Sequence, residues 1–146
     1  MITVDTRAAA ARFASTWQAG WAGHDAAAIV PLYAEDCVHR SMPFRPVHRG
    51  RAGMASYIRW TFGAERTTEV RFGEPMVSGD RAVVEFRATL VEQEDARPVT
   101  ITGCALVRFG PDGLVAESRD YWQVSDGHRR PEGTMFLAGF RAGGAG

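Results

Sequence analysis

Residues 114–124 read Leu-Val-Ala-Glu-Ser-Arg-Asp-Tyr-Trp-Gln-Val, and this stretch decides the fold. Its β-branched and aromatic residues favour a strand, and the Gly-Pro-Asp-Gly sequence at residues 110–113 favours a tight turn just before it. The two together predict the second strand of a β-hairpin. Because side chains alternate across a strand, Ser118, Asp120 and Trp122 should share one face.

Asp120 is the candidate catalytic residue of this strand. The alternation places its carboxylate beside the indole of Trp122. A carboxylate on an apolar, partly dry surface costs free energy unless it is paired, and it is a common general base where it occurs. The alternative is an Asp120 that forms an ordinary salt bridge on the protein surface.

The composition indicates one folded domain that does not bind nucleic acid. The chain has 146 residues, enough to bury a core, and Lys plus Arg and Asp plus Glu both total 17. Basic residues do not cluster with aromatic ones, which argues against nucleic-acid binding. No signal-peptide pattern and no apolar run of bilayer length occur, so we expect a cytoplasmic protein that does not associate with membranes. Cys37 and Cys104 should be small buried residues without a disulfide.

Three helices are predicted in the first half of the chain. Asp5 or the residue after it can cap the first helix, and Gly23 ends it. Asp25 can cap a short second helix, which Pro31 should kink or end early. The third helix should run from about residue 51 to 62, where apolar residues recur at helical spacing.

The rest of the chain is predicted to form strands, separated by turn residues: 37–41, 69–77, 82–92, 99–109 and 114–124. The fold class is therefore α+β, with three N-terminal helices packed in a strongly curved, mainly antiparallel sheet. Such a sheet should leave a cone-shaped pocket with an apolar bottom. We expect this one domain to span residues 1–140 and residues 141–146 to be a disordered tail.

Two motifs resemble those of a known superfamily. They are Leu-Tyr-Ala-Glu-Asp at residues 32–36 and Arg-Asp-Tyr-Trp at residues 119–122. With the order of helices and strands, they resemble the nuclear transport factor 2-like, or SnoaL-like, superfamily over about residues 8 to 125. The Cys-Val-His-Arg-Ser-Met-Pro run at residues 37–43 and the second motif are similar to limonene-epoxide hydrolase, which has Tyr-x-Asn-Met-Pro and Arg-Asp-Tyr-Phe there.

The resemblance implies roles for three residues. Asp120 falls on the aspartate that activates water in that family. His39 and Ser41 fall on the Tyr and Asn that hold the water, and both are departures from the motif. The family also has an Arg-x-Asp pair on the strand that here contains residues 83–89, where this chain offers only Glu85-x-Arg87 or Arg87-x-Thr89.

The orientation of that strand decides what Arg87 can do. Glu85 and Arg87 lie on one face, and Val84 and Phe86 on the other. If the polar face lines the pocket, Arg87 could bridge Glu85 and Asp120, so that one carboxyl acts as acid and the other as base. Alternatively, the apolar face packs on the helices, and Glu85 and Arg87 belong to the convex face.

His39 is the only histidine in a predicted strand, and the ordinary pKa of histidine, near neutrality, suits proton transfer. The alternative is a structural role for His39. His24, His48 and His128 are predicted to be turn or loop residues. No spacing of His, Asp and Glu resembles a metal site, so neither a metal nor another cofactor is expected. Aromatic residues should line the pocket and bind substrate, or form core: Trp17, Trp21, Tyr33, Tyr57, Trp60 and Trp122.

These features predict a cofactor-independent enzyme that acts on a small hydrophobic molecule, polyketide-like or terpenoid-like, by general acid–base chemistry. Isomerisation, cyclisation, dehydration and epoxide opening remain open. The alternatives are a non-catalytic binding protein with the same pocket and an assembly module. We also expect a homodimer formed through the convex sheet face. The apolar residues of the C-terminal segment should cover the pocket mouth or a partner: Met135, Phe136, Leu137 and Phe140.

Overall fold

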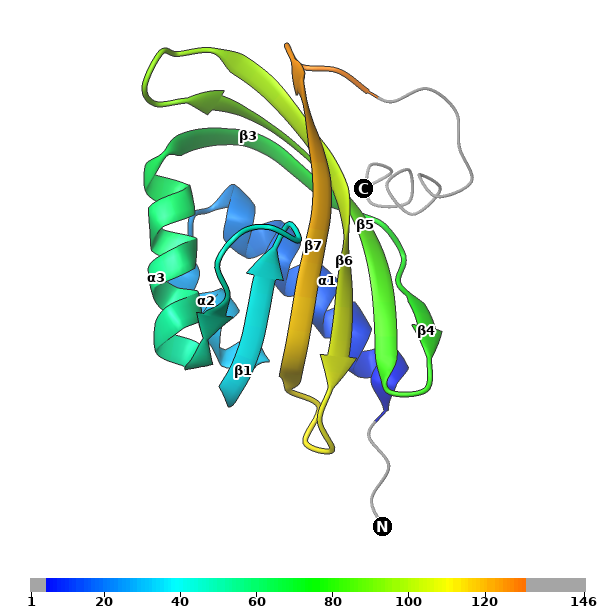
Figure 1. Ribbon diagram of the computed structural model, residues 1–146. Coiled ribbons are helices and arrows are strands. Elements are labelled where there is room, and N and C mark those ends of the chain that lie inside the picture. The colour runs from blue at the N-terminus through cyan, green and yellow to red at the C-terminus, as the bar shows by residue number, and fades with distance from the viewer. Residues whose placement is uncertain (1–4, 131–146) are drawn as a thin grey trace.

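The computed structural model describes residues 5–130, in which helices pack against one side of a bent sheet (Figure 1). The helices are α1 (Thr6–Ala22), α2 (Ala26–Ile29) and α3 (Gly50–Gly63), with a 3₁₀ turn, η1 (Val30–Leu32), after α2. The strands are β1 (Tyr33–Ser41), β2 (His48–Arg49), β3 (Glu65–Phe72), β4 (Met76–Ser78), β5 (Arg81–Glu92), β6 (Pro98–Phe109) and β7 (Val115–Asp126). None of the helices between residues 5 and 130 is both long and apolar enough to span a membrane.

The helix ends follow the predicted capping residues. The Asp5 side chain accepts a hydrogen bond from the Ala8 amide at 3.0 Å, and Gly23 ends α1. Asp25 caps α2 by accepting from the Ala28 amide at 3.1 Å. Pro31 lies in the 3₁₀ turn that replaces further α-helix, so the predicted early end is confirmed.

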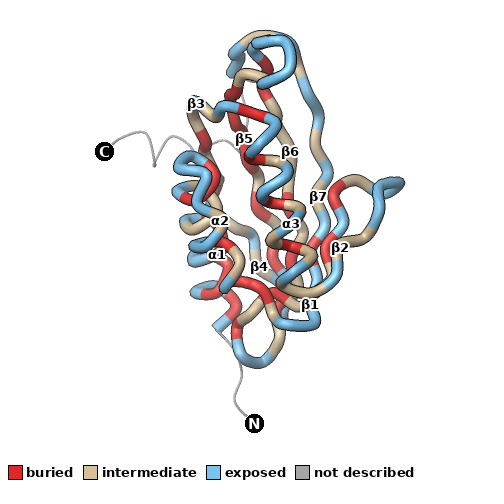
Figure 2. The backbone as a smooth tube through the Cα atoms, turned by 90° about the vertical axis from the view of Figure 1, so that its left-hand side faces the viewer, coloured by how far each residue is buried: buried red, intermediate tan, exposed pale blue. Residues whose placement is uncertain are grey.

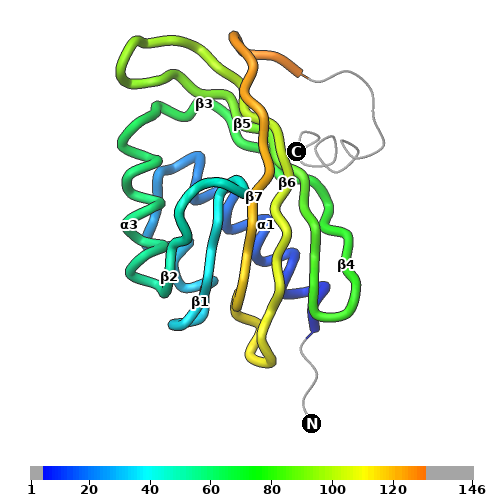
Figure 3. Tube along the Cα trace, viewed as in Figure 1, coloured from blue at the N-terminus to red at the C-terminus, as the bar shows by residue number. Residues whose placement is uncertain are grey.

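The sheet is open and mixed. Its strand order is β2-β1-β7-β6-β5-β3, with β4 paired to β5. β1 and β7 pair in parallel and all other pairs are antiparallel. Figure 3 shows how β3, β5 and β6 bend over the end of α3 while β1 and β7 run side by side. The predicted α+β class, with three helices and a curved, mainly antiparallel sheet, is confirmed.

The structure differs from the predicted strands in three places. β1 begins at Tyr33, four residues earlier than predicted. The segment predicted as one strand at 69–77 is two strands, because the chain leaves the ladder at residues 73–75, Gly-Glu-Pro, where proline cannot donate a ladder hydrogen bond. β3 also begins earlier, at Glu65. The early start makes Glu65, a residue that lines the cavity, part of the strand.

The core lies between the helices and the concave face of the sheet. Figure 2 shows buried residues along the helices and strands, and they include Phe13 and Trp21 of α1 and Met54 and Ile58 of α3. On β5 the buried apolar side chains are those at even positions: Ala82, Val84, Phe86, Ala88 and Leu90. The even face of β5 is therefore the concave face.

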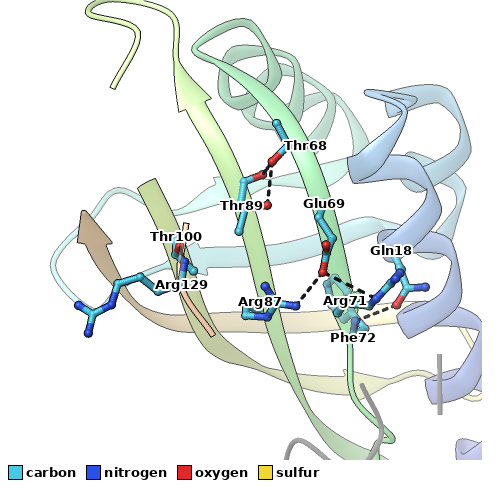
Figure 4. Close-up of polar contacts among 9 residues, drawn as sticks. All are labelled: Gln18, Thr68, Glu69, Arg71, Phe72, Arg87, Thr89, Thr100 and Arg129. Atoms are coloured by element: carbon cyan, nitrogen blue, oxygen red, sulfur yellow. Dashed lines mark hydrogen bonds and ion pairs between the residues drawn. The ribbon is translucent and has the colours of Figure 1, made fainter. Parts of the chain in front are cut away.

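The odd face of β5 is convex, and this corrects the prediction for Arg87. Arg87 donates to Glu69 Oε1 of β3 at 2.7 Å, and Arg71 lies 3.9 Å from the same carboxylate (Figure 4). Thr89 on the same face contacts Thr68 Oγ1 at 2.7 Å. The predicted bridge from Arg87 to Glu85 and Asp120 is wrong, because alternation turns Glu85 and Arg87 away from the cavity.

Candidate active site

A cavity of about 650 Å³ lies between the helices and the concave face. Its walls are mostly apolar, and Asp120 and Glu65 are among the few ionisable groups that border it. All six aromatic residues predicted to bind substrate line the cavity: Trp17, Trp21, Tyr33, Tyr57, Trp60 and Trp122. Trp60 lies at the rim, where 68% of its surface is exposed. The dimensions suit a small organic molecule.

His39 and Asp120 meet across two parallel strands. β1 and β7 pair so that His39 is level with Ser118 and Ser41 is level with Asp120. His39 Nε2 lies 3.4 Å from Asp120 Oδ2, with the imidazole 2% exposed and the carboxylate 21% exposed. Nε2 is fully enclosed and forms no hydrogen bond with residues 5–130. The two side chains are therefore close without a hydrogen bond between them, and the Asp120 carboxylate faces the cavity.

The other nitrogen of His39 is held by a buried hydroxyl. Nδ1 lies 2.7 Å from Ser118 Oγ. Nearby, Trp17 Nε1 donates to the Tyr33 hydroxyl at 3.0 Å, and Tyr33 in turn interacts with Ser118. Burial raises the pKa of Tyr33 well above its ordinary value, and the charge of Asp120 adds to the rise. Tyr33 therefore remains a neutral phenol.

Ser41 links the remaining side chains of the site. It is fully buried, and Trp122 Nε1 donates to its Oγ at 2.9 Å. Tyr57 of α3 also interacts with Ser41 and with Thr61. Burial raises the pKa of Tyr57 to about 12, with the charge of Asp120 as the next cause. Tyr57 therefore keeps its proton at physiological pH and can donate a hydrogen bond into the cavity.

His48 was predicted to lie in a loop, but it belongs to strand β2, level with His39. Its ring is 6.3 Å from that of His39 and 4.5 Å from that of Tyr57, measured between centroids. Burial lowers the pKa of His48, and His39 lowers it further. His48 thus packs as a neutral ring behind the site.

The five predicted catalytic residues divide into two groups. Asp120, His39 and Ser41 lie together, whereas Glu85 and Arg87 are on the convex face and cannot supply the acid. Tyr57 was predicted only to line the pocket, and neither Ser118 nor Tyr33 was predicted to form hydrogen bonds at the site. One signal was available for Ser118, since it shares a strand face with Asp120 and Trp122.

Within residues 5–130, no group of three His, Cys, Asp or Glu side chains is placed to hold a metal ion. Cys37 and Cys104 are free thiols, the first buried and the second half-buried. The ionisable side chains at the site include a carboxylate, an imidazole and phenols, and the guanidinium of Arg45 also lines the cavity.

A comparison with known families matches residues 11–118 to the SnoaL-like domain. The chain belongs to the SnoaL-like family. This confirms the resemblance predicted from the two sequence motifs. The matched segment of this SnoaL-like domain includes His39, Ser41 and Ser118 but ends before Asp120 and Trp122. No curated protein sequence matches the chain.

Solved structures share the fold of this SnoaL-like domain. SalBIII, described as an epoxide hydrolase/cyclase-like enzyme with a role in pyran ring formation in the polyether salinomycin, matches with a TM-score of 0.72 and 19% identity, over 84% of this chain and 98% of SalBIII. A protein from Bacillus subtilis, provisionally named an isomerase, gives 0.70 and 20% over 82% and 90% of the two chains. A similarly named protein from Rhodopseudomonas palustris gives 0.66 and 15% over 79% and 89%. At these identities the likeness shows the fold alone.

Proposed function

We propose that this SnoaL-like domain is an enzyme that isomerises or cyclises a small hydrophobic molecule by general acid–base catalysis. One observation carries the proposal. The Asp120 carboxylate faces an apolar cavity, next to an imidazole with which it forms no hydrogen bond and near a phenol that stays protonated. A cavity with a base and a hydrogen-bond donor is what a proton-transfer reaction needs.

Asp120 is the base in the proposed reaction. Its Oδ2 atom takes a proton from a C–H or O–H group of the substrate. The electron pair left behind can move into a neighbouring carbonyl group, which forms an enolate and shifts a double bond. Alternatively, it closes a ring by attacking an epoxide carbon, and the broken C–O bond then leaves its electrons on the epoxide oxygen. In both cases negative charge develops on a substrate oxygen.

Tyr57 is the group proposed to meet that charge. Its phenol can donate only a hydrogen bond to the oxygen, and Asp120 then gives the proton it removed back to the substrate. Alternatively, the phenol gives its own proton to the oxygen, and the proton on Asp120 then passes to the phenolate, so the reaction is neutral overall by either route. Ser41 contacts Tyr57 and is level with Asp120 on the neighbouring strand, which gives the returning proton a short path.

His39 is proposed to position the base. The Tyr33 hydroxyl accepts from Trp17, so its own proton can go to Ser118, and Ser118 can donate to Nδ1. The ring then carries a proton on Nε2, which faces Asp120 Oδ2 at 3.4 Å. This arrangement sets the orientation of the imidazole beside the base.

Proton transfer can be tested on a small substrate panel. Purified protein would be incubated in D₂O with 4,5-epoxyhexan-1-ol, styrene oxide and a β,γ-unsaturated cyclohexenone, and products would be analysed by mass spectrometry. We expect a cyclic ether, a diol or a deuterated conjugated enone from at least one compound, and loss of that product with Asp120→Asn. If the panel binds, as shown by tryptophan quenching, but yields no product, the binding-protein alternative replaces the proposed function.

A further inference from the structure

A second carboxylate, that of Glu65, borders the cavity far along the sheet from Asp120. Glu65 begins β3 and pairs with Glu92, the last residue of β5, whereas Asp120 is level with Ala105 of β6 and, through it, with Val84. Val84 and Glu92 are eight residues apart on β5, about 26 Å along the strand. Glu65 is nevertheless only 6% exposed and lines the same cavity.

A β-bulge turns Glu65 toward the cavity. The pairing of β3 with β5 shifts register between Thr67 and Glu69. On one side of the shift Glu65 and Thr67 face the concave side, and on the other side Val70 does, while Glu69 points to the convex face. Bulges often re-aim side chains next to functional sites. Without the shift, the alternation that buries Val70 would turn Glu65 outward.

Residues 5–130 donate hydrogen bonds to one oxygen of Glu65. Oε2 accepts from Trp21 Nε1 at 3.0 Å and from Thr67 Oγ1 at 2.7 Å. Because the Thr67 hydroxyl donates its proton to Glu65, it must accept a hydrogen bond from His24 Nε2, which lies 2.8 Å away. The His24 ring stacks on Phe62. No residue between 5 and 130 donates a hydrogen bond to Oε1, and Glu65 lines the cavity.

The described part of the chain, residues 5–130, supplies Glu65 with hydrogen bonds but not with a cation. No Arg or His of residues 5–130 forms an ion pair with Glu65. A buried carboxylate with an unused oxygen is costly unless a donor reaches it. The rings of Trp17 and Trp21 line the same cavity, so a molecule bound there can supply the donor.

We propose that Glu65 Oε1 binds a hydrogen-bond donor, a hydroxyl or an ammonium group, on the part of the substrate remote from the reacting atoms. The substrate class is then an apolar skeleton with a donor at one end and the reacting group at the other. This inference rests on the proposed function only in calling the ligand a substrate. The binding preference itself is independent of turnover.

Four probes that share a naphthalene skeleton test the preference: 2-propylnaphthalene, 2-(2-naphthyl)ethanol, 2-(2-naphthyl)ethylamine and 1-(2-naphthyl)propan-2-one. Dissociation constants would be measured by tryptophan quenching for the wild type, Glu65→Gln and a matched control, Glu69→Gln, on the convex side of the same strand. In Glu65→Gln the amide oxygen should take the bonds from Trp21 and Thr67, which leaves the amide NH₂ group facing the cavity.

The Kd ratio of the hydrocarbon to the alcohol or the amine should therefore fall about tenfold in Glu65→Gln, and the ketone, an acceptor only, should gain affinity. The larger fall identifies the preferred donor, hydroxyl or ammonium. Glu69→Gln should keep the wild-type ratios. Equal ratios in the wild type and Glu65→Gln, or equal changes in both variants, would overturn the inference.

Two further comparisons keep the test decisive. If Glu65→Gln does not fold, Glu65→Asp keeps the charge but withdraws the oxygen by one methylene group, and it should lose the same preference. Asp120→Asn should keep the wild-type Kd ratios, because Asp120 lies at the opposite end of the cavity from Glu65. If Asp120→Asn abolishes turnover while Glu65→Gln leaves the ratios unchanged, this inference alone fails. The opposite result removes the proposed function alone.

Discussion

The two faces of the sheet each carry an acid–base pair, and the pairs differ in how completely they are satisfied. On the convex face, Arg87 donates to Glu69 at 2.7 Å, and Arg71 lies near the same carboxylate. On the concave face, His39 and Asp120 approach to 3.4 Å without a hydrogen bond, and the carboxylate borders a cavity. A satisfied pair stabilises the fold, whereas a pair left partly unsatisfied beside a cavity is available for chemistry.

The largest effect should come from removing the charge on the concave face. Asp120→Asn keeps the size of the side chain but removes the proton acceptor, so kcat on a substrate from the panel should fall by about a hundredfold to ten-thousandfold. Glu69→Gln makes the same chemical change on the convex face and should leave kcat unchanged. Wild-type turnover in Asp120→Asn would show that the comparison assigns the wrong face to catalysis.

Tyr57→Phe should have the next largest effect. The change removes one hydroxyl, and loss of a donor to a developing oxyanion should lower kcat by about tenfold to a thousandfold, with little change in the affinity for 2-(2-naphthyl)ethanol. Because the pKa of Tyr57 is raised to about 12, wild-type turnover should not decline from loss of this proton below pH 10. An alkaline decline near pH 8 that vanishes in Tyr57→Phe would contradict this assignment.

Arg87→Met should show the reverse pattern, a loss of stability without a loss of activity. Arg87 is buried, and its removal leaves Glu69 without its closest partner, although Glu69 is partly exposed and can be hydrated. We expect the free energy of unfolding to fall by about 1–3 kcal/mol, measured by urea denaturation at pH 7, while kcat stays within about twofold. A large fall in kcat with a normal fold would restore the original hypothesis that Arg87 belongs to the site.

Strand β7 was predictable because only one of its faces is buried. Its alternation placed Ser118, Asp120 and Trp122 together, and the structure does the same. Strand β5 was not, because both of its faces are buried in the middle: Arg87 and Thr89 are as enclosed as Phe86. Alternation then divides the residues into two faces but does not indicate which face is concave.

Glu65 could not have been found by alternation at all. A register shift in β3 separates it from Val70, so any count back from the apolar residues of that strand gives the wrong face. The tertiary packing of β2 and α3 places His48 and Tyr57 beside His39, and the sequence has no local signal for this packing. Fold class, helix caps and the main site strand, by contrast, depend on local pattern.

Three predictions concern features beyond the site. The apolar residues predicted to cover the pocket mouth lie outside the described residues: Met135, Phe136, Leu137 and Phe140. So does the tail predicted to be disordered. Homodimerisation through the convex face stays a prediction, and light scattering at tens of micromolar would test it. A monomer would show that the convex pair Arg87–Glu69 stabilises a single chain only.

The smallest predicted effect distinguishes two carboxylates on the convex face itself. Burial raises the pKa of Glu85, and its Oε1 forms no hydrogen bond with residues 5–130, whereas Glu69 is paired. The folded protein holds the Glu85 proton more tightly than the unfolded chain does. Protonated Glu85 therefore stabilises the fold fully below the ordinary glutamate pKa, and this contribution is lost as the pH rises through the folded pKa.

Glu85→Gln keeps the shape of the side chain without the charge. Its melting temperature should exceed that of the wild type by a few degrees at pH 7.5, and the gain should shrink toward pH 4. Glu69→Gln should lower the melting temperature at pH 7.5, because it removes the partner of Arg87. Equal shifts of the same sign in the two variants would show that pairing does not separate these carboxylates.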